Sequence, residues 1–343
     1  MEFDSTGRCL RTNMAGSRMK ISKEQLVRES ASTGFRLEIL EKVGYLLHLL
    51  ETFQSHPFLK GRLVLKGGTA LNLFLLDLPR LSVDIDLNCV GAEDREQMLA
   101  ERPKIESAIS AVCSREGFAI RRIPEEHAGG KWQLRYNSAF GQGGNLELDI
   151  NFMFRVPLFP TILMDSRKVG VYQAMQIPVL DIHELAAGKL AALLSRKAGR
   201  DLFDAHQLLL RNDIDMTKLR TSFVTYGAMS RKDWRTVSVD DVGFEANELA
   251  NMLIPVLSSN VLERLGSIEN WAVQYVEETR NALGAVLPFE HRELEFLDRL
   301  LDHGEIVPNL LTEDMELQKR IQAQPMLEWK AQNVRQFKGK IGI

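Results

Sequence analysis

Cysteine is scarce in this chain. Only three cysteines occur among 343 residues, and the spacing of Cys9, Cys89 and Cys113 is not that of a metal site. Their odd number and small count favour a reducing cytoplasm over a disulfide framework. Long apolar runs are absent as well, and the first residues, which include Glu2 and Asp4, lack the apolar stretch of a signal peptide. We therefore predict a cytoplasmic protein with no membrane partner.

An excess of positive charge is also missing. The formal net charge is −3 at pH 7, which excludes a globally basic protein. A nucleic-acid partner would therefore need a local basic patch. Hydrophobic residues make up 45% of the chain and charged residues 26%, as is ordinary for a globular protein, and the length predicts about two domains.

A pair of glycines follows the first clear strand. Residues 63–66 are mostly apolar and predict a strand, Gly67 and Gly68 come next, and a helix is expected from Thr69 to about Asp77. Such a turn before a helix leaves backbone N–H groups open to an anion, and the helix dipole assists. The alternative is an ordinary tight turn. The segment is neither a P-loop, because no Gly-Lys-Ser/Thr closes it, nor a dinucleotide fingerprint, because the third glycine is missing.

The next predicted strand, over residues 81–87, carries two carboxylates. Asp84 and Asp86 alternate with apolar residues, so they lie on the same face of the strand. Neighbouring carboxylates repel each other, and Mg²⁺ would remove that conflict because it prefers one or two carboxylates together with phosphate oxygens. The alternative is a solvated surface strand. Together with the glycine turn, the pair predicts binding of a nucleoside triphosphate and phosphoryl-type transfer.

A third acidic strand is expected at residues 146–152. Its residues alternate strictly, with apolar side chains on one face and Glu147, Asp149 and Asn151 on the other. In an antiparallel or mixed sheet, Asp149 would lie beside the first two carboxylates. Three carboxylates suit two Mg²⁺ ions, or one ion and a general base. A solvated edge strand explains this segment equally well by itself, and the upstream carboxylates favour the functional interpretation.

A lysine among small residues marks a later helix. Asp181 is the expected N-cap, with Glu184 three residues on, and Lys189 is surrounded by alanines and a glycine that permit close approach of a ligand. We interpret Lys189 as a phosphate-binding lysine, the alternative being a solvated helix face. Asp204 lies in the first turn of the following helix, where it could simply complement the helix dipole.

Other patterns complete the expected secondary structure. They predict a Ser22-capped helix over 21–53, a helix over 93–116, strands over 118–123 and 132–137, glycine turns at 129–130 and 141–144, and helices over 239–256, 261–283 and 290–303. The basic segment 319–340 is expected to be a solvated tail, with contact to a nucleic-acid backbone as the alternative.

Four blocks of sequence resemble the nucleotidyltransferase toxins of the AbiEii/AbiGii family. The blocks are residues 66–71, 80–87, 148–151 and 184–189, the last accompanied by Arg196, Arg200, Asp201 and Asp204. The resemblance spans residues 60–210 and implies an α+β fold. The expected architecture is an arm over 1–19, a DNA polymerase β-like nucleotidyltransferase core with a mixed sheet flanked by helices over 20–178, and a helical C-terminal domain over 179–343 that contributes Lys189 and Asp204 to the site.

The resemblance also implies an activity. Family members are toxins of bacterial toxin–antitoxin or phage-defence pairs that transfer a nucleotide from an NTP, and some modify the 3′ end of tRNA and so stop translation. The implied partners are tRNA or another RNA acceptor and an antitoxin encoded next to the toxin. The implied cofactor is Mg²⁺ or Mn²⁺. By position, the resemblance assigns Asp84, Asp86 and Asp149 to metal binding and catalysis, Lys66, Gly67, Gly68, Ser82, Lys189 and Arg200 to the nucleotide, and Lys189 and Asp204 to catalysis.

Two alternatives stay open at this point. The acceptor could be a protein or a small molecule, and the fold could be a catalytically idle binding module, against which the intact carboxylate pair argues. The position of Ser82 adds an expectation: a phosphate there would place about two negative charges beside the carboxylates and should close the site.

Overall fold

A mixed seven-stranded sheet forms the centre of the molecule. The computed structural model describes residues 18–124 and 128–341, so most of the expected N-terminal arm lies outside the described residues. The strands are β1 (Leu63–Lys66), β2 (Asp84–Cys89), β3 (Ala119–Arg122), β4 (Gly129–Asn137), β5 (Gly143–Asn151), β6 (Ile162–Met164) and β7 (Ile177–Val179). Their order is β3-β4-β5-β2-β1-β7-β6. The β2–β5 and β1–β7 pairs are parallel and the others antiparallel, which confirms the predicted mixed sheet.

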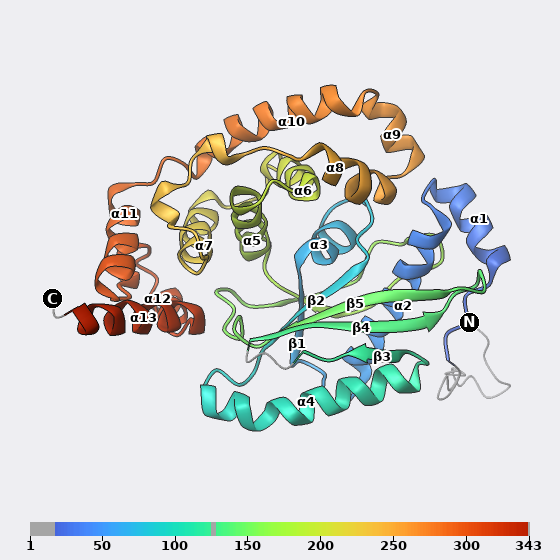
Figure 1. Cartoon of the computed structure of the whole chain (residues 1–343), viewed down its shortest axis with the longest axis horizontal. Coiled ribbons are helices and arrows are strands. Elements are labelled where there is room, and N and C mark those ends of the chain that lie inside the picture. The colour runs from blue at the N-terminus through green and yellow to red at the C-terminus, as the bar shows by residue number, and fades with distance from the viewer. Residues whose placement is uncertain (1–17, 125–127, 342–343) are drawn as a thin grey trace, which may run out of the picture.

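Helices flank this sheet. The N-terminal part contributes α1 (Lys23–Thr33), α2 (Leu37–Ser55), α3 (Gly67–Ala70), which continues into a π-helical turn (Leu71–Leu75), and α4 (Arg95–Arg115). After β7 the described chain is helical: α5 (Ile182–Ser195), α6 (Gly199–Leu209), α7 (Met216–Ala228), α8 (Ala246–Glu248), α9 (Ser259–Leu265), α10 (Ile268–Ala282), α11 (His291–Asp298), α12 (Met315–Gln322) and α13 (Pro325–Ile341). Figure 1 shows the helices from α5 onward arranged as an arc on one side of the sheet, with α4 on the other side.

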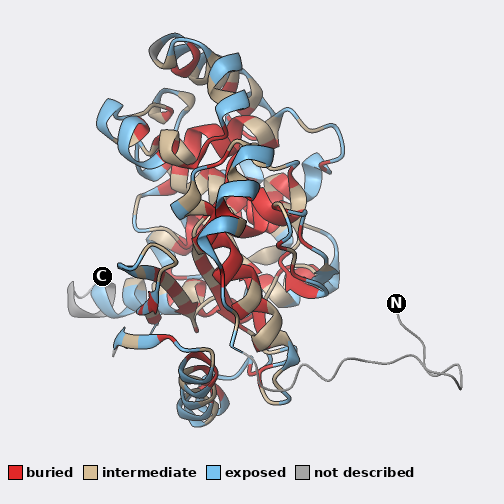
Figure 2. Ribbon diagram, turned by 90° about the vertical axis from the view of Figure 1, so that its right-hand side faces the viewer, coloured by how far each residue is buried: buried red, intermediate tan, exposed pale blue. Residues whose placement is uncertain are grey.

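The core lies between the sheet and these helices (Figure 2), where buried residues concentrate. On β5, Leu146, Leu148 and Ile150 are buried, as the alternation predicted. Trp234 and Trp271 are also buried in the helical part, so they serve packing. No helix within the described ranges is both long and apolar enough to cross a membrane.

Several predicted elements have different boundaries in the structure. Residues 21–53 form two helices, because Gly34 adopts φ +74° and ends α1, while the predicted Ser22 cap is confirmed. Gly129 and Gly130 belong to β4 rather than to a turn: a Cβ at Gly129 would lie 2.0 Å from the carbonyl oxygen of Ile150 on the partner strand. The position requires a glycine because the backbone of β5 approaches it closely, and the chain does not reverse there.

Further breaks also follow glycine positions. The predicted helix over 261–283 is divided into α9 and α10 at Gly266, whose φ is +62°. Residues 239–256 form only short helical pieces, with Gly243 in the non-helical gap between two of them. The second predicted strand begins at Asp84 rather than at residue 81 and extends to Cys89. The predicted helices over 93–116 and 290–303 are confirmed, the second ending in a π-helical turn.

Candidate active site

The acidic residues form a row across two neighbouring strands. Parallel pairing of β2 with β5 places Asp86 opposite Asp149 and Asp84 opposite Glu147. Because side chains two residues apart on a strand share a face, the three predicted carboxylates lie on one face of the sheet, with Glu147 as a fourth acidic group. All four are partly exposed. We call this set the acidic face. On the adjacent strand β4, Lys131 donates a hydrogen bond to Glu147, with 2.8 Å between Nζ and Oε2.

Charge on the acidic face is only partly compensated. Burial raises the pKa of Asp84, and the charge of Asp86 raises it further. Burial also raises the pKa of Asp86, where Lys66 opposes the effect and Asp149 adds to it. This is the electrostatic conflict that the alternation of carboxylates predicted.

The donor set fits a magnesium ion that shares its coordination with a substrate. Within residues 18–124 and 128–341, no group of three or more His, Cys, Asp or Glu side chains is gathered closely enough to hold an ion by itself. Mg²⁺ commonly uses only one or two carboxylates and completes its octahedron with water and phosphate oxygens. The two carboxylates on this face repel each other and have raised pKa values, so a bound cation would stabilise their ionised forms. Asp84 and Asp86 therefore fit the implied metal.

The glycine turn packs directly against the acidic face. Gly67 has φ +72°, and a Cβ there would lie 2.3 Å from Oδ2 of Asp86. At Gly68 a Cβ would lie 3.1 Å from Nη2 of Arg80 and from Oγ of Ser82. The hydroxyl of Thr69 donates to the carbonyl oxygen of Asp84, with 2.5 Å between the oxygens, and so ties the start of α3 to β2. The turn and the carboxylate strand are therefore held together, as the sequence predicted.

A buried network of charges lies behind the turn. Asp204 on α6 is completely buried and accepts hydrogen bonds from Arg80, with distances of 2.8 Å to Nε and 2.7 Å to Nη2. Burial alone would raise the pKa of Asp204, but Arg80 and Lys189 outweigh burial and hold that pKa well below its usual range. Asn72 donates to the same carboxylate at 3.1 Å. Asp204 thus faces the protein interior.

Lys189 joins this network to the open part of the site. Its ammonium group lies 2.8 Å from Oδ1 of Asp201 and 2.9 Å from Oδ2 of Asp204. Burial lowers the pKa of Lys189, but the two carboxylates outweigh that effect and raise it. Asp201 also accepts a hydrogen bond from Arg196 at 2.7 Å. Arg200 lies nearer β2, with Nη1 3.9 Å from Oδ2 of Asp84.

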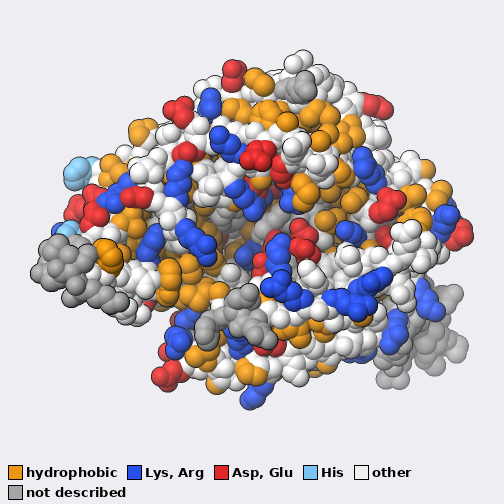
Figure 3. All heavy atoms as spheres, in the orientation of Figure 1, with side chains coloured by type: hydrophobic (Ala, Val, Ile, Leu, Met, Phe, Trp, Pro, Cys, Tyr) orange, Lys and Arg blue, Asp and Glu red, His pale blue; other side chains and the backbone are white. Residues whose placement is uncertain are grey.

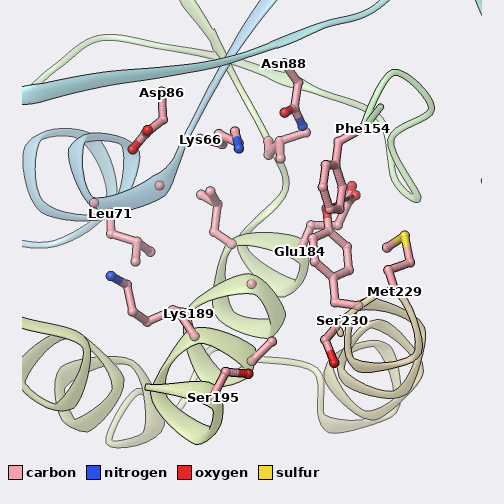
Figure 4. Close-up of a pocket in the computed structure, with 18 of the residues that line it drawn as sticks. Lys66, Leu71, Asp86, Asn88, Phe154, Glu184, Lys189, Ser195, Met229 and Ser230 are labelled. Carbon is pink, nitrogen blue, oxygen red and sulfur yellow. Dashed lines mark hydrogen bonds between the residues drawn. The ribbon is translucent and has the colours of Figure 1, made fainter. Parts of the chain in front are cut away.

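A cavity of about 410 Å³ opens beside the turn (Figure 4). Five of the predicted site residues line it: Lys66, Gly67, Gly68, Asp86 and Lys189. The cavity is not lined by the other predicted site residues, which are Asp84, Asp149, Ser82, Asp204 and Arg200. We call it the donor cavity. Its far end is formed by Asn88, Phe154, Tyr226, Met229 and Ser230, and its size is within the range of ordinary ligand sites.

Several residues of this region were not identified from the sequence as part of the site. Arg80 belongs to the block 80–87 but has no predicted role, although a lone arginine beside apolar neighbours suggests a buried partner. Glu184 was interpreted as a capping residue, and it instead accepts hydrogen bonds from the Phe159 amide and the Tyr226 hydroxyl. Burial raises the pKa of Glu184 to about 7. Asn88 and Phe154 have no motif that could have revealed them.

Comparison with known proteins identifies the family and supports the fold. The family model described as nucleotidyl transferase AbiEii toxin, type IV TA system, matches residues 48–331. The structure also resembles MenT4, a nucleotidyltransferase toxin from Mycobacterium tuberculosis H37Rv, with a TM-score of 0.56 and 19% sequence identity, over 89% of this chain and 99% of that one. At this identity the structural match supports the fold only. No curated protein matches the sequence significantly.

The family match covers well over half of the chain and includes all four blocks of sequence that carried the resemblance. The structure supplies the mixed sheet with a helical C-terminal part that the resemblance implied. The chain therefore belongs to the AbiEii family of nucleotidyltransferase toxins from type IV toxin–antitoxin systems.

Proposed function

We propose that this toxin acts in the cytoplasm of a bacterium, as one half of a toxin–antitoxin or phage-defence pair, and transfers a nucleoside monophosphate from an NTP to the 3′ end of tRNA, which blocks translation. The observation that carries the proposal is that the glycine turn, Asp86 of the acidic face and Lys189 line one cavity. Residues 20–178 would form the catalytic core, and residues 179–343 the helical domain that supplies Lys189 and its partner Asp204.

The donor triphosphate would bind at the turn end of the donor cavity. Backbone amides of Gly67 and Gly68 and the side chains of Lys66 and Lys189 supply hydrogen bonds and positive charge for its phosphates. Ser82 and Arg200 would add contacts from beside the turn. Asp84 and Asp86 would hold Mg²⁺ or Mn²⁺, with Asp149 opposite Asp86 on β5. The ion would neutralise charge on the pyrophosphate leaving group when bound.

The transfer step would use the same residues. The acceptor hydroxyl loses its proton to the carboxylate of Asp149 and its oxygen attacks the α-phosphorus, while the bond to the bridging oxygen breaks and pyrophosphate leaves. Lys189 stabilises the charge that develops on the transferred phosphoryl group. Asp204 and Asp201 hold the ammonium group of Lys189 in place. Asp204 then acts as a positioning residue, because it is buried behind the lysine.

An RNA acceptor is favoured by a second, larger cavity. It has a volume of about 1270 Å³ and shares Met229 and Ser230 with the donor cavity. We call it the acceptor cavity. Arg95, Arg231 and the exposed indole of Trp329 line it, and this mixture of positive charge and an aromatic surface suits single-stranded RNA. Figure 3 shows Lys and Arg side chains around the hollow on this face of the molecule.

The antitoxin that family membership implies would act on this activity. Ser82 lies directly behind Gly68 and is mostly buried. A phosphate on its hydroxyl would add negative charge beside the acidic face and so oppose binding of the triphosphate. Mass spectrometry of the toxin co-produced with the neighbouring gene product tests whether Ser82 is modified.

Incubation of the purified toxin with each labelled NTP, Mg²⁺ and total RNA tests the proposed reaction. We expect label in tRNA, and no transfer or toxicity with Asp84→Ala, while thermal unfolding shows that the variant is folded. Asp77→Ala is the matched control, because Asp77 is a highly exposed carboxylate outside both cavities. Full toxicity of Asp84→Ala would end the proposal.

The same experiment separates the alternatives. Label in a protein or a small molecule would show that the acceptor is not RNA. Failure of the wild-type toxin to bind any NTP with Mg²⁺ would favour a catalytically idle binding module.

A further inference from the structure

The far end of the donor cavity holds a polar group without a partner. Asn88 follows Asp84 and Asp86 at the next same-face position of β2 and is 1% exposed. In the part of the chain that the structure describes, its Oδ1 atom accepts no hydrogen bond. A buried amide oxygen without a donor is costly and is rarely retained for packing alone. In Figure 4 the Asn88 amide points into the cavity, beside Phe154.

Two aromatic rings lie at the same end. The Phe154 and Tyr226 rings stack with 5.6 Å between centroids and 29° between planes. Both side chains are partly exposed and line the cavity. The spacing is too small for a third ring to enter between them, and Nζ of Lys66 lies 5.6 Å from the Phe154 centroid. A planar ligand would therefore stack on the part of the pair that Lys66 leaves uncovered.

Hydrogen bonds hold the Tyr226 side chain and the Phe154 backbone in position. The Tyr226 hydroxyl is hydrogen-bonded to Oε1 of Glu184 at 2.9 Å, and the Phe154 amide donates to Oδ1 of Asn151 at 3.0 Å. Glu184 itself is anchored by the Phe159 amide at 3.0 Å. A rigid aromatic surface loses little conformational entropy on binding, which favours a planar ligand.

The chemistry of the two ends is therefore different. The turn end, with Lys189, suits phosphate, while the far end offers an aromatic surface, the carboxamide of Asn88 and the side chain of Glu184. Lys66 lies between the two ends, with its Nζ 5.6 Å from the centroid of the Phe154 ring. A carboxamide carries a donor and an acceptor side by side, and that pattern pairs with the polar edge of a nucleobase. The ligand that joins a phosphate to such a ring is a nucleotide.

We propose that the far end of the donor cavity is a nucleobase subsite in which Asn88 reads the polar edge of the base and the Phe154–Tyr226 pair stacks against it. The inference rests on the proposed nucleotidyl transfer and adds to it the residue that selects the base. The base could belong to the donor NTP or to the terminal nucleotide of the acceptor, and both offer the same chemistry to Asn88.

Asn88→Leu tests the subsite in the full-length toxin. Leucine has nearly the shape of asparagine but no hydrogen-bonding group, so base selection should fall at least about tenfold, the loss expected when about 1.4 kcal/mol of discrimination is removed. Binding of inorganic triphosphate, which has no base, should not change. Asn145→Leu is the matched control, because Asn145 is exposed on β5 outside the cavity.

Stability distinguishes a binding role from a structural one. Asn88 is buried without a partner for its oxygen, so its replacement by leucine should leave the midpoint of thermal unfolding unchanged or higher. A structural asparagine would give the opposite result, a lower midpoint in Asn88→Leu. Phe154→Leu provides a second variant: in the arm that shows base selection, it should weaken binding of every base without changing their order.

Two arms identify the source of the base. In the first, affinities for the four NTPs are measured with Mg²⁺ and no RNA. In the second, transfer is measured from the best NTP to short RNAs that differ only in their 3′-terminal base. Loss of selection in Asn88→Leu in the first arm assigns the subsite to the donor, and in the second arm to the acceptor.

The outcomes also separate this inference from the proposed function. A wild-type toxin that shows no base preference in either arm would overturn the subsite, as would an Asn88→Leu variant that keeps the full preference; in both cases nucleotidyl transfer itself would stand. Failure of the wild-type toxin to bind any NTP would instead overturn the proposed function.

Discussion

At the scale of single residues, Gly67 is the position where backbone geometry and the acidic face meet. Its φ of +72° lies in the left-handed region, and the missing Cβ makes room for the carboxylate of Asp86. A glycine can be required by a positive φ or by a lack of space for a Cβ atom. Gly61 allows the two effects to be compared, because it has φ +74° but nothing within 4 Å of its Cβ position.

Gly67→Ala should therefore be more harmful than Gly61→Ala. Both substitutions strain the backbone by about 1 kcal/mol. In Gly67→Ala the added methyl also overpacks against Asp86, at a further cost of about 1–3 kcal/mol. Displacing that carboxylate should lower nucleotidyl transfer about 100-fold. Urea unfolding and transfer assays of both variants check this, and equal activity of the two would show that the contact with Asp86 does not matter.

Glu184 makes stability depend on pH. Burial raises its pKa to about 7, above the ordinary value of 4.5, so the fold favours the protonated side chain. Its contribution to the free energy of unfolding is complete below about pH 4.5 and is lost as the pH rises through about 7. Glu184→Gln stays neutral throughout.

The stability of Glu184→Gln relative to wild type should therefore increase between pH 4.5 and pH 7.5, by about 3 kcal/mol at most. Urea unfolding at the two pH values measures the change. A difference between the two proteins that is independent of pH would mean that Glu184 is not held in its neutral form.

At the scale of elements, one buried ion pair connects α6 to the chain that leads into β2. Arg80 and Asp204 are 3% and 0% exposed, and Lys189 shares the same carboxylate. Asp204→Asn would leave two buried cations without their common partner, and we expect a loss of about 3–5 kcal/mol of unfolding free energy.

Asp213→Asn is the control for that substitution. Asp213 pairs with Arg211, but its side chain is 63% exposed, so the expected change is within about 0.5 kcal/mol. Urea unfolding of both variants compares a buried carboxylate with an exposed one. Equal stability of the two variants would show that the buried network around Asp204 contributes little.

The elements that the sequence predicted well are those specified by local pattern. Alternation on β5 predicted which face is buried, and the Asp181 and Ser22 caps mark real helix starts. Local pattern could not locate the helix breaks at Gly34 and Gly266, because a single glycine inside a helical pattern is also compatible with a continuous helix.

The candidate site was predicted in part for the same reason. Asp84, Asp86 and the glycine turn are near one another in the sequence, and the alternation of residues 146–152 predicted the face on which Asp149 lies, which the register of β2 with β5 places opposite Asp86. Asn88 and Arg80 depend on partners or cavities formed by residues far along the chain, and the position of Asp204 behind Lys189 depends on how α5 packs on α6. No short-range pattern carries that information.

At the scale of the whole molecule, two cavities that share lining residues lie between the sheet and the helices from α5 onward. Met229 and Ser230, which directly follow α7, line both of them. The donor cavity is enclosed by α5 and the sheet, whereas the acceptor cavity is bordered by α13 and carries exposed aromatic surface. This arrangement predicts that donor and acceptor binding can be weakened separately.

Trp329→Ala should weaken the acceptor alone. Trp329 is 54% exposed on α13 and lines the acceptor cavity but not the donor cavity, so losing its stacking surface should raise KM for RNA about tenfold or more. KM for the NTP and kcat should stay within about twofold of wild type, because the acidic face is unchanged. Met315→Ala is the control, since Met315 is 72% exposed on α12 and lines neither cavity. Steady-state kinetics with each substrate varied in turn measures both constants. A rise in KM for the NTP in Trp329→Ala would mean that the two cavities bind a single ligand, and an unchanged KM for RNA would place the acceptor elsewhere on the surface.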